Sequence, residues 1–161
     1  MNGPPIWQRL LAALAYTLPW SDALGFGSSL LGQFPWLNLL ILPALPMLQF
    51  KALFSLGGLG IGSLLLFLLL YAAVVRNPRV PYTVRFNVLL ALMIDILLFV
   101  LQLAVDILIR QTFGNNILTR TIDNTIFLGA LLLLSFAVVE CLRGKDPDVP
   151  TLSEAVRMQL Y

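Results

Sequence analysis

The stretch SLGGLGIGSLLLFLLLYAAVV, residues Ser55–Val75, decides the class of fold because it contains no charged side chain. A helix rises about 1.5 Å per residue, so this stretch would extend roughly 31 Å, which matches a bilayer hydrocarbon core about 30 Å thick. Arg76 ends the stretch, and Asn77-Pro78 is typical of a turn. We therefore predict a transmembrane helix at Ser55–Val75.

The composition of the whole chain also indicates a membrane protein. Of its 161 residues, 59% are hydrophobic and only 11% are charged, with a mean hydropathy of +0.90. Soluble domains are about 45–50% apolar and about 25% charged. The chain has no His and one Cys, Cys141, which excludes His-based catalytic triads, His–metal sites and an internal disulfide. The net charge of +2 predicts no nucleic-acid partner.

Three further stretches have the character of membrane spans. Phe86–Ile109 lies between Arg85 and Arg110, Ile122–Leu142 follows it, and a shorter span covers Ile6–Trp20. A cleaved signal peptide is the alternative interpretation of residues 1–25, but no small-residue cleavage site follows at the usual place.

The segment Trp36–Phe50 is apolar but is interrupted by Pro43 and Pro46. Two prolines remove backbone donors, which lipid tolerates only where protein re-satisfies the carbonyl groups. We predict an interfacial or re-entrant segment whose wet end is marked by Gln49 and Lys51.

The basic residues favour four spans with both termini on the inner side. Seven basic residues then lie inside and three outside; a fifth span at Trp36–Phe50 would make the division six against four. The seven are Arg9, Arg76, Arg79, Arg85, Arg143, Lys145 and Arg157, and the three are Lys51, Arg110 and Arg120.

The polar tail, Gly144–Tyr161, contains a capping-box pattern from Thr151 to Glu154 that predicts a short helix. The predicted fold is all-α: a polytopic membrane protein forming one domain, residues 1–161, with four transmembrane helices, the Pro-interrupted segment and this C-terminal helix.

Asp95 is the outlier of the third span, because it lies about 15 Å along the helix from Arg85 and so near the bilayer centre. An exposed carboxylate at that depth costs at least about 2.5–3.5 kcal/mol. At 100° per residue, Gln102 and Asp106 lie within about 20° of Asp95 on the helix. We predict a polar seam of Asp95, Gln102 and Asp106 that either contacts a polar path or fixes helix packing.

Gly58 and Gly62 form a small-residue motif that predicts close helix packing. The glycine-rich run lacks the Lys-Ser/Thr of a phosphate-binding loop, and no catalytic motif is present. We therefore expect no enzyme activity and no cofactor.

Several blocks of the sequence form a recognisable pattern: Val75-Arg76-Asn77-Pro78, Arg85-Phe86-Asn87, Ala91 with Asp95-Ile96, the tail Asp148–Ala155 and the opening Arg9–Tyr16. Together they resemble the twenty-kilodalton membrane subunit family of the Tic translocon. Leu90 departs from the family pattern, because a polar residue, often Gln, is expected there.

The resemblance implies a component of preprotein translocation in a chloroplast inner envelope or a cyanobacterial membrane, with cytosolic or stromal termini. It also implies contacts with membrane lipid, with other translocon subunits or further copies of the chain, and with a translocating polypeptide. Apolar residues begin at Ile6, so we expect no transit peptide, which favours a cyanobacterial protein over a plastid form.

Two alternatives come from other functional classes. The first is a small-solute or ion transporter that uses Asp95 for coupling, for which no inverted repeat is visible. The second is a membrane scaffold without conduction, whose polar residues only fix helix packing.

Overall fold

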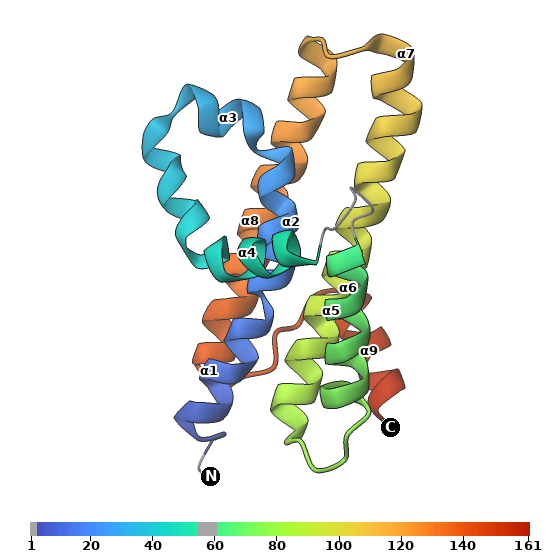
Figure 1. The fold of residues 1–161 in the computed structure, drawn as a ribbon. Coiled ribbons are helices and arrows are strands. Elements are labelled where there is room, and N and C mark those ends of the chain that lie inside the picture. Colours follow the sequence, from blue (N-terminus) through green and yellow to red (C-terminus); the bar gives the residue numbers. More distant parts are fainter. Residues whose placement is uncertain (1–2, 55–60) are drawn as a thin grey trace.

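The computed structural model describes residues 3–54 and 61–161, and every regular element within them is helical, which confirms the all-α prediction. Figure 1 shows their arrangement. The α-helices are α1 (Ile6–Ala15), α2 (Thr17–Phe26), α3 (Ser28–Gln33), α4 (Leu45–Leu53), α5 (Ile61–Leu70), α6 (Tyr82–Ala104), α7 (Gln111–Phe113), α8 (Ile117–Leu142) and α9 (Leu152–Leu160). A 3₁₀ helix, η1 (Pro35–Ala44), and two π-helices, η3 (Tyr71–Val75) and η4 (Val105–Arg110), complete the set.

A long antiparallel hairpin runs the full height of the molecule (Figure 1). Its arms are the continuous helical run Tyr82–Phe113 and α8, 32 and 26 residues long, and both are apolar enough to cross a membrane. At about 1.5 Å per residue they extend roughly 48 and 39 Å, beyond a hydrocarbon core of about 30 Å. The helices therefore continue past the predicted spans into a polar tip, where Asn116 caps α8 by accepting a hydrogen bond from the Thr119 N–H (3.2 Å).

The first apolar helix is longer than predicted. Two ten-residue helices, α1 and α2, follow one another through Tyr16, so the run ends at Phe26 rather than at Trp20. Pro19 does not stop it because it occupies the third position of α2, where a helix has no partner for the backbone N–H.

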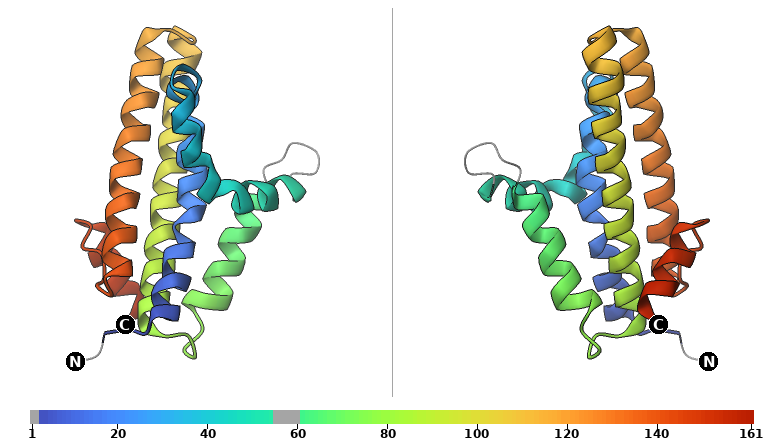
Figure 2. Two further views of the ribbon diagram at one scale, coloured as in Figure 1. Left: turned by 90° about the vertical axis from the view of Figure 1, so that its left-hand side faces the viewer. Right: turned by 90° about the vertical axis from the view of Figure 1, so that its right-hand side faces the viewer.

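The run Pro35–Leu53 is also long and apolar enough to cross a membrane, although only 6% of it is buried. It changes direction where η1 ends and α4 begins, so that η1 descends beside α2 while α4 crosses in front of it (Figures 1 and 2). Pro43 lies inside η1 and Pro46 in the first turn of α4, which is the interruption that the sequence predicts.

The second predicted span is described only from residue 61 onward, as the shorter apolar run of α5 and η3. Gly58 lies outside the described residues. A Cβ on Gly62 would come within 2.8 Å of the Lys51 carbonyl oxygen, so glycine allows α5 to approach the backbone of α4.

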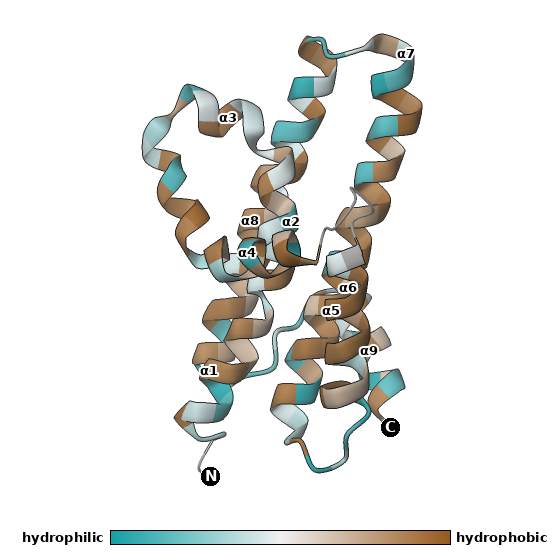
Figure 3. Ribbon diagram, in the orientation of Figure 1, coloured by the Kyte–Doolittle hydropathy of each residue, from teal (hydrophilic) through white to brown (hydrophobic). Residues whose placement is uncertain are grey.

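The core lies where α1 and α2 pack against α6 and α8. Large apolar side chains also lie on the outside, as Leu132 (74% exposed) and Leu108 (67%) illustrate. In Figure 3, hydrophilic residues alternate with hydrophobic ones in both arms toward the hairpin tip. Both termini lie at the opposite end (Figure 2).

Candidate functional site: a charge cluster and a polar recess

Asp95 belongs to a cluster of polar side chains at mid-height in the bundle. Its side chain is buried, at 7% exposure, and its carboxyl group interacts with Asp22 of α2 and Lys51 of α4. Lys51 forms an ion pair with Asp22, and its Nζ donates a hydrogen bond to the Ser21 hydroxyl (2.8 Å). We call Ser21, Asp22, Lys51 and Asp95 the charge cluster.

The charge cluster joins three elements, α2, α4 and α6. Asp95 lies roughly 20 Å along the helix from Tyr82, and a helix that crossed a membrane from Tyr82 would place it well inside a hydrocarbon core about 30 Å thick. Buried charges at such depth require partners, because the desolvation of a lone ion costs several kcal/mol. Lys51 supplies a cation to two carboxyl groups and thereby holds α4 across the bundle.

The prediction that Lys51 marks the water-exposed end of the segment Trp36–Phe50 is therefore wrong. Its side chain is only 12% exposed and reaches inward to Asp22. Asp22 was not among the predicted site residues, although it is a carboxylate within an apolar run, which is the same signal that singled out Asp95.

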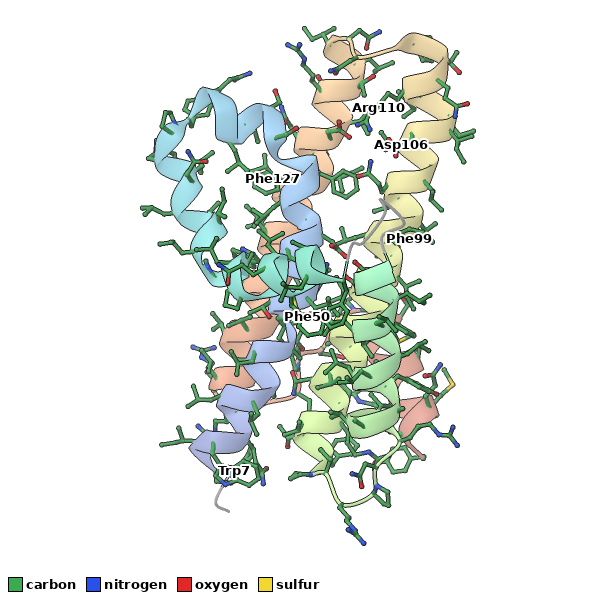
Figure 4. The ribbon with its side chains drawn as sticks, viewed as in Figure 1. Trp7, Phe50, Phe99, Asp106, Arg110 and Phe127 are labelled. Carbon is green, nitrogen blue, oxygen red and sulfur yellow. The ribbon has the colours of Figure 1, made fainter. Side chains whose placement is uncertain are left out.

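A second polar network lies closer to the hairpin tip. The Gln102 amide donates to both carboxylate oxygens of Asp106 (3.0 and 3.1 Å), and Arg110 forms ion pairs with Asp106 and with Asp123 of α8, the latter at 2.9 Å. Figure 4 shows Asp106 and Arg110 in the space between the two arms of the hairpin. Gln102 and Asp106 share a helical stripe with Asp95, but their contacts make them part of this second network rather than of the charge cluster.

The network forms part of the wall of an open polar recess with a volume of about 680 Å³, lined by α2, α3 and the hairpin. Amide, hydroxyl and charged side chains of both signs dominate its wall. The lining residues are Gly25, Ser28, Ser29, Gly32, Gln33, Gln102, Arg110, Asn115, Arg120 and Asp123.

Two buried polar atoms border these sites without a hydrogen-bond partner among the described residues: Oδ1 of Asp95 and Oδ1 of Asp123. The Asp95 carboxyl group is hydrogen-bonded to that of Asp22, and the Asp123 carboxylate forms an ion pair with Arg110. Residues 3–54 and 61–161 bring no three His, Cys, Asp or Glu side chains together as a metal site.

A family model described as "Chloroplast import apparatus Tic20-like" matches residues 1–156. The chain belongs to the Tic20 family. A Tic20 family protein of Synechocystis is 39% identical over 153 residues, which cover 95% of this chain and 92% of that protein. Protein TIC 20-v, chloroplastic, of Arabidopsis thaliana is 32% identical over 154 residues, 95% of this chain and 71% of that protein. Protein TIC 20-II of the same plant is 32% identical over 158 residues, 97% and 74% respectively.

The residues that carry the Tic20 resemblance connect helices at the terminal end of the bundle. Asn87 is fully buried: its Oδ1 accepts a hydrogen bond from the Tyr16 hydroxyl (2.7 Å), and its Nδ2 donates to the Thr83 carbonyl (2.8 Å). The Arg85 Nε donates to the carbonyl of Val75 (2.9 Å), the last residue of η3. These contacts tie α1 and η3 to α6.

The remaining motif residues serve the loop and the tail. The Asn77 side chain accepts a hydrogen bond from the Arg79 N–H (3.0 Å) and so shapes the turn before α6, while Arg76 is exposed. Phe86 is fully buried, and the Arg157 guanidinium of α9 lies 5.8 Å from the centre of its ring.

Proposed function

We propose that this Tic20-family protein is a non-enzymatic membrane component of a protein translocon, and that the polar recess is the surface it presents to a translocating polypeptide. In this proposal it is a core or channel-associated subunit. The basic end of the bundle, which holds both termini, faces the cytosol or stroma. The polar recess then opens toward the other side of the membrane.

The observation that carries the proposal is the chemistry of the recess wall. A polypeptide entering a membrane needs partners for its backbone N–H and C=O groups, because each one left unsatisfied costs several kcal/mol. The amides of Gln33 and Asn115 can both donate and accept hydrogen bonds, and the Gln102 amide oxygen can accept one, because its amide nitrogen already donates to Asp106. Such groups can satisfy successive peptide units whatever their side chains are.

In this proposal, one copy of the chain lines only one side of a path for the polypeptide. Below the recess the bundle is closed by packed apolar side chains and by the charge cluster. We therefore place the conducting path between this protein and a neighbour, either another translocon subunit or a second copy.

A photo-crosslinking amino acid at Gln102 tests the proposal against a matched position at Leu132, which faces outward from α8. A precursor is arrested in transit by a folded domain at its end. We expect the precursor to be captured from Gln102 and from Gln33, and lipid alone to be captured from Leu132. The proposal would be contradicted by equal capture of the precursor from all three positions, or by capture of lipid alone from Gln102.

A scaffold without conduction is the second candidate, and the charge cluster favours it. The cluster links three elements, as expected for side chains that fix helix packing. A scaffold predicts that Asp95→Asn lowers thermal stability in detergent while precursor transport is unchanged.

A further inference from the structure

A groove on the outside of the bundle, distinct from the polar recess, runs between α1–α2 and α8. We call it the α1–α8 groove. Leu10 and Leu142 line its lower end, Thr17 and Ser135 its middle, and Trp20 and Pro43 its upper end. Its volume of about 700 Å³ lies within the range of about 300–1,000 Å³ typical of small-molecule sites.

Three of the four polar side chains that line the α1–α8 groove are hydrogen-bonded within the protein, and the fourth is Ser135. The Thr17 hydroxyl donates to the Leu14 carbonyl (2.6 Å), the Trp20 indole N–H to the Leu40 carbonyl (2.8 Å), and the Tyr16 hydroxyl to Asn87 (2.7 Å). The wall therefore offers mainly hydrocarbon contact, which suits an acyl chain.

The length of the groove matches one leaflet of a bilayer. Leu10 and Trp20 are separated by roughly 15 Å along the helical run. Half of a hydrocarbon core about 30 Å thick is also about 15 Å. A chain in the groove would therefore start at the interface where the termini lie and end near the bilayer centre.

Basic side chains stand at the interfacial end of the groove. Arg9 lies one turn from Ala13 on the groove face of α1, and Arg143 lies one turn beyond Val139 of α8. The Arg9 Nη1 contacts the Leu142 carbonyl (3.4 Å), which brings the two ends together. The Arg143 side chain is 65% exposed.

Carboxylates only partly offset this charge. Glu140 pairs with Arg143 (3.0 Å), and Asp146 is half-buried in the following loop. Against these two stand Arg9, Arg143 and the exposed Lys145, so the end of the groove is net positive. Basic pockets between helices at this level attract anionic headgroups.

We propose that the α1–α8 groove binds one acyl chain of an anionic diacyl lipid whose headgroup lies at the positive end formed by Arg9, Arg143 and Lys145. The apolar wall, the leaflet-matched length and the positive end together select this ligand over a neutral lipid.

The fluorescence of Trp20 provides the test. Trp7→Phe and Trp36→Phe, both at exposed positions, leave Trp20 as the only tryptophan. The protein is reconstituted in phosphatidylcholine vesicles that contain a small fraction of either brominated phosphatidylglycerol or brominated phosphatidylcholine. We expect brominated phosphatidylglycerol to quench Trp20 at several-fold lower mole fraction.

Two variants connect that preference to the site. The double variant Arg143→Gln with Lys145→Gln should lower the preference for brominated phosphatidylglycerol, on the order of five-fold for each basic side chain removed. Arg79→Gln, in the loop before α6, should leave that preference unchanged. Ser135→Phe should fill the groove and reduce quenching by both lipids.

Three results would overturn the proposal. The first is equal quenching by the two lipids. The second is a preference that survives Arg143→Gln with Lys145→Gln. The third is the absence of quenching by either lipid while a crosslinker at Trp20 captures a second copy, which would place a protein helix in the groove.

Discussion

Among single residues, Lys51 matters as much to this molecule as Asp95, although only Asp95 stands out in the sequence. The Lys51 side chain is only 12% exposed, and its ammonium group interacts with Asp22, Asp95 and the Ser21 hydroxyl at once. The removal of one partner from such a buried set leaves the opposite charge without compensation, which costs more than the set contributes when complete.

Lys51→Met should therefore destabilise the fold strongly, by on the order of 3 kcal/mol, because the buried carboxyl group of Asp95 and the partly exposed one of Asp22 lose their cation. Asp95→Asn should cost less, since Lys51 and Asp22 remain paired. Unfolding in detergent, followed by circular dichroism, measures both. Lys145→Met, at an exposed position, is the control and should change stability little. A Lys51→Met protein as stable as that control would show that the charge cluster does not hold α4.

Among the elements, α9 shows how a correct prediction can rest on a wrong detail. The short C-terminal helix is present, but Thr151 has a φ of +65° and no side-chain cap hydrogen bond, so the capping box is not formed. Ser153 shapes the turn instead: its Oγ accepts from the Val149 N–H (2.8 Å) and donates to the Pro147 carbonyl (2.7 Å).

The loop before α9 carries a carboxyl group that opposes docking. Burial raises the pKa of Asp146 above its ordinary value, and Arg157 offsets this only in part. The docked tail thus binds the proton more tightly than the undocked tail, so docking weakens as the pH rises from the ordinary Asp value through the raised one.

Asp146→Asn should therefore strengthen docking of α9 at neutral pH and slow hydrogen exchange of its backbone amides. Asp148→Asn is the matched control, since Asp148 is exposed and lies 3.8 Å from Arg157. Faster exchange in Asp146→Asn, or equal changes in both variants, would contradict this explanation.

At the scale of the whole molecule, hydrophobicity predicts the helices better than it predicts their ends. Most of the helical run from Tyr82 and most of α8 follow from long, predominantly apolar sequence. Their extension past Ile109 and upstream of Ile122 does not, because hydropathy marks where lipid ends, whereas hydrogen bonding lets a helix continue into water.

The charge cluster and the polar recess also follow only partly from the sequence. Helical periodicity places Asp95, Gln102 and Asp106 on one stripe, but it cannot show that Lys51 arrives from α4, since that contact depends on the bend after η1. The recess likewise combines α3 with the hairpin tip, which are far apart in the sequence. Tertiary packing, rather than local pattern, assembles both.

The most direct test of the central claim measures whether a polypeptide in transit covers the polar recess. Cys141→Ala removes the only native thiol, and single cysteines then replace Gln33 in the recess or Ile117, which is 83% exposed at the tip. Labelling by a membrane-impermeant maleimide is followed with and without an arrested precursor. We expect the precursor to protect position 33 and not position 117; equal labelling of position 33 in both conditions would contradict a translocation surface in the recess.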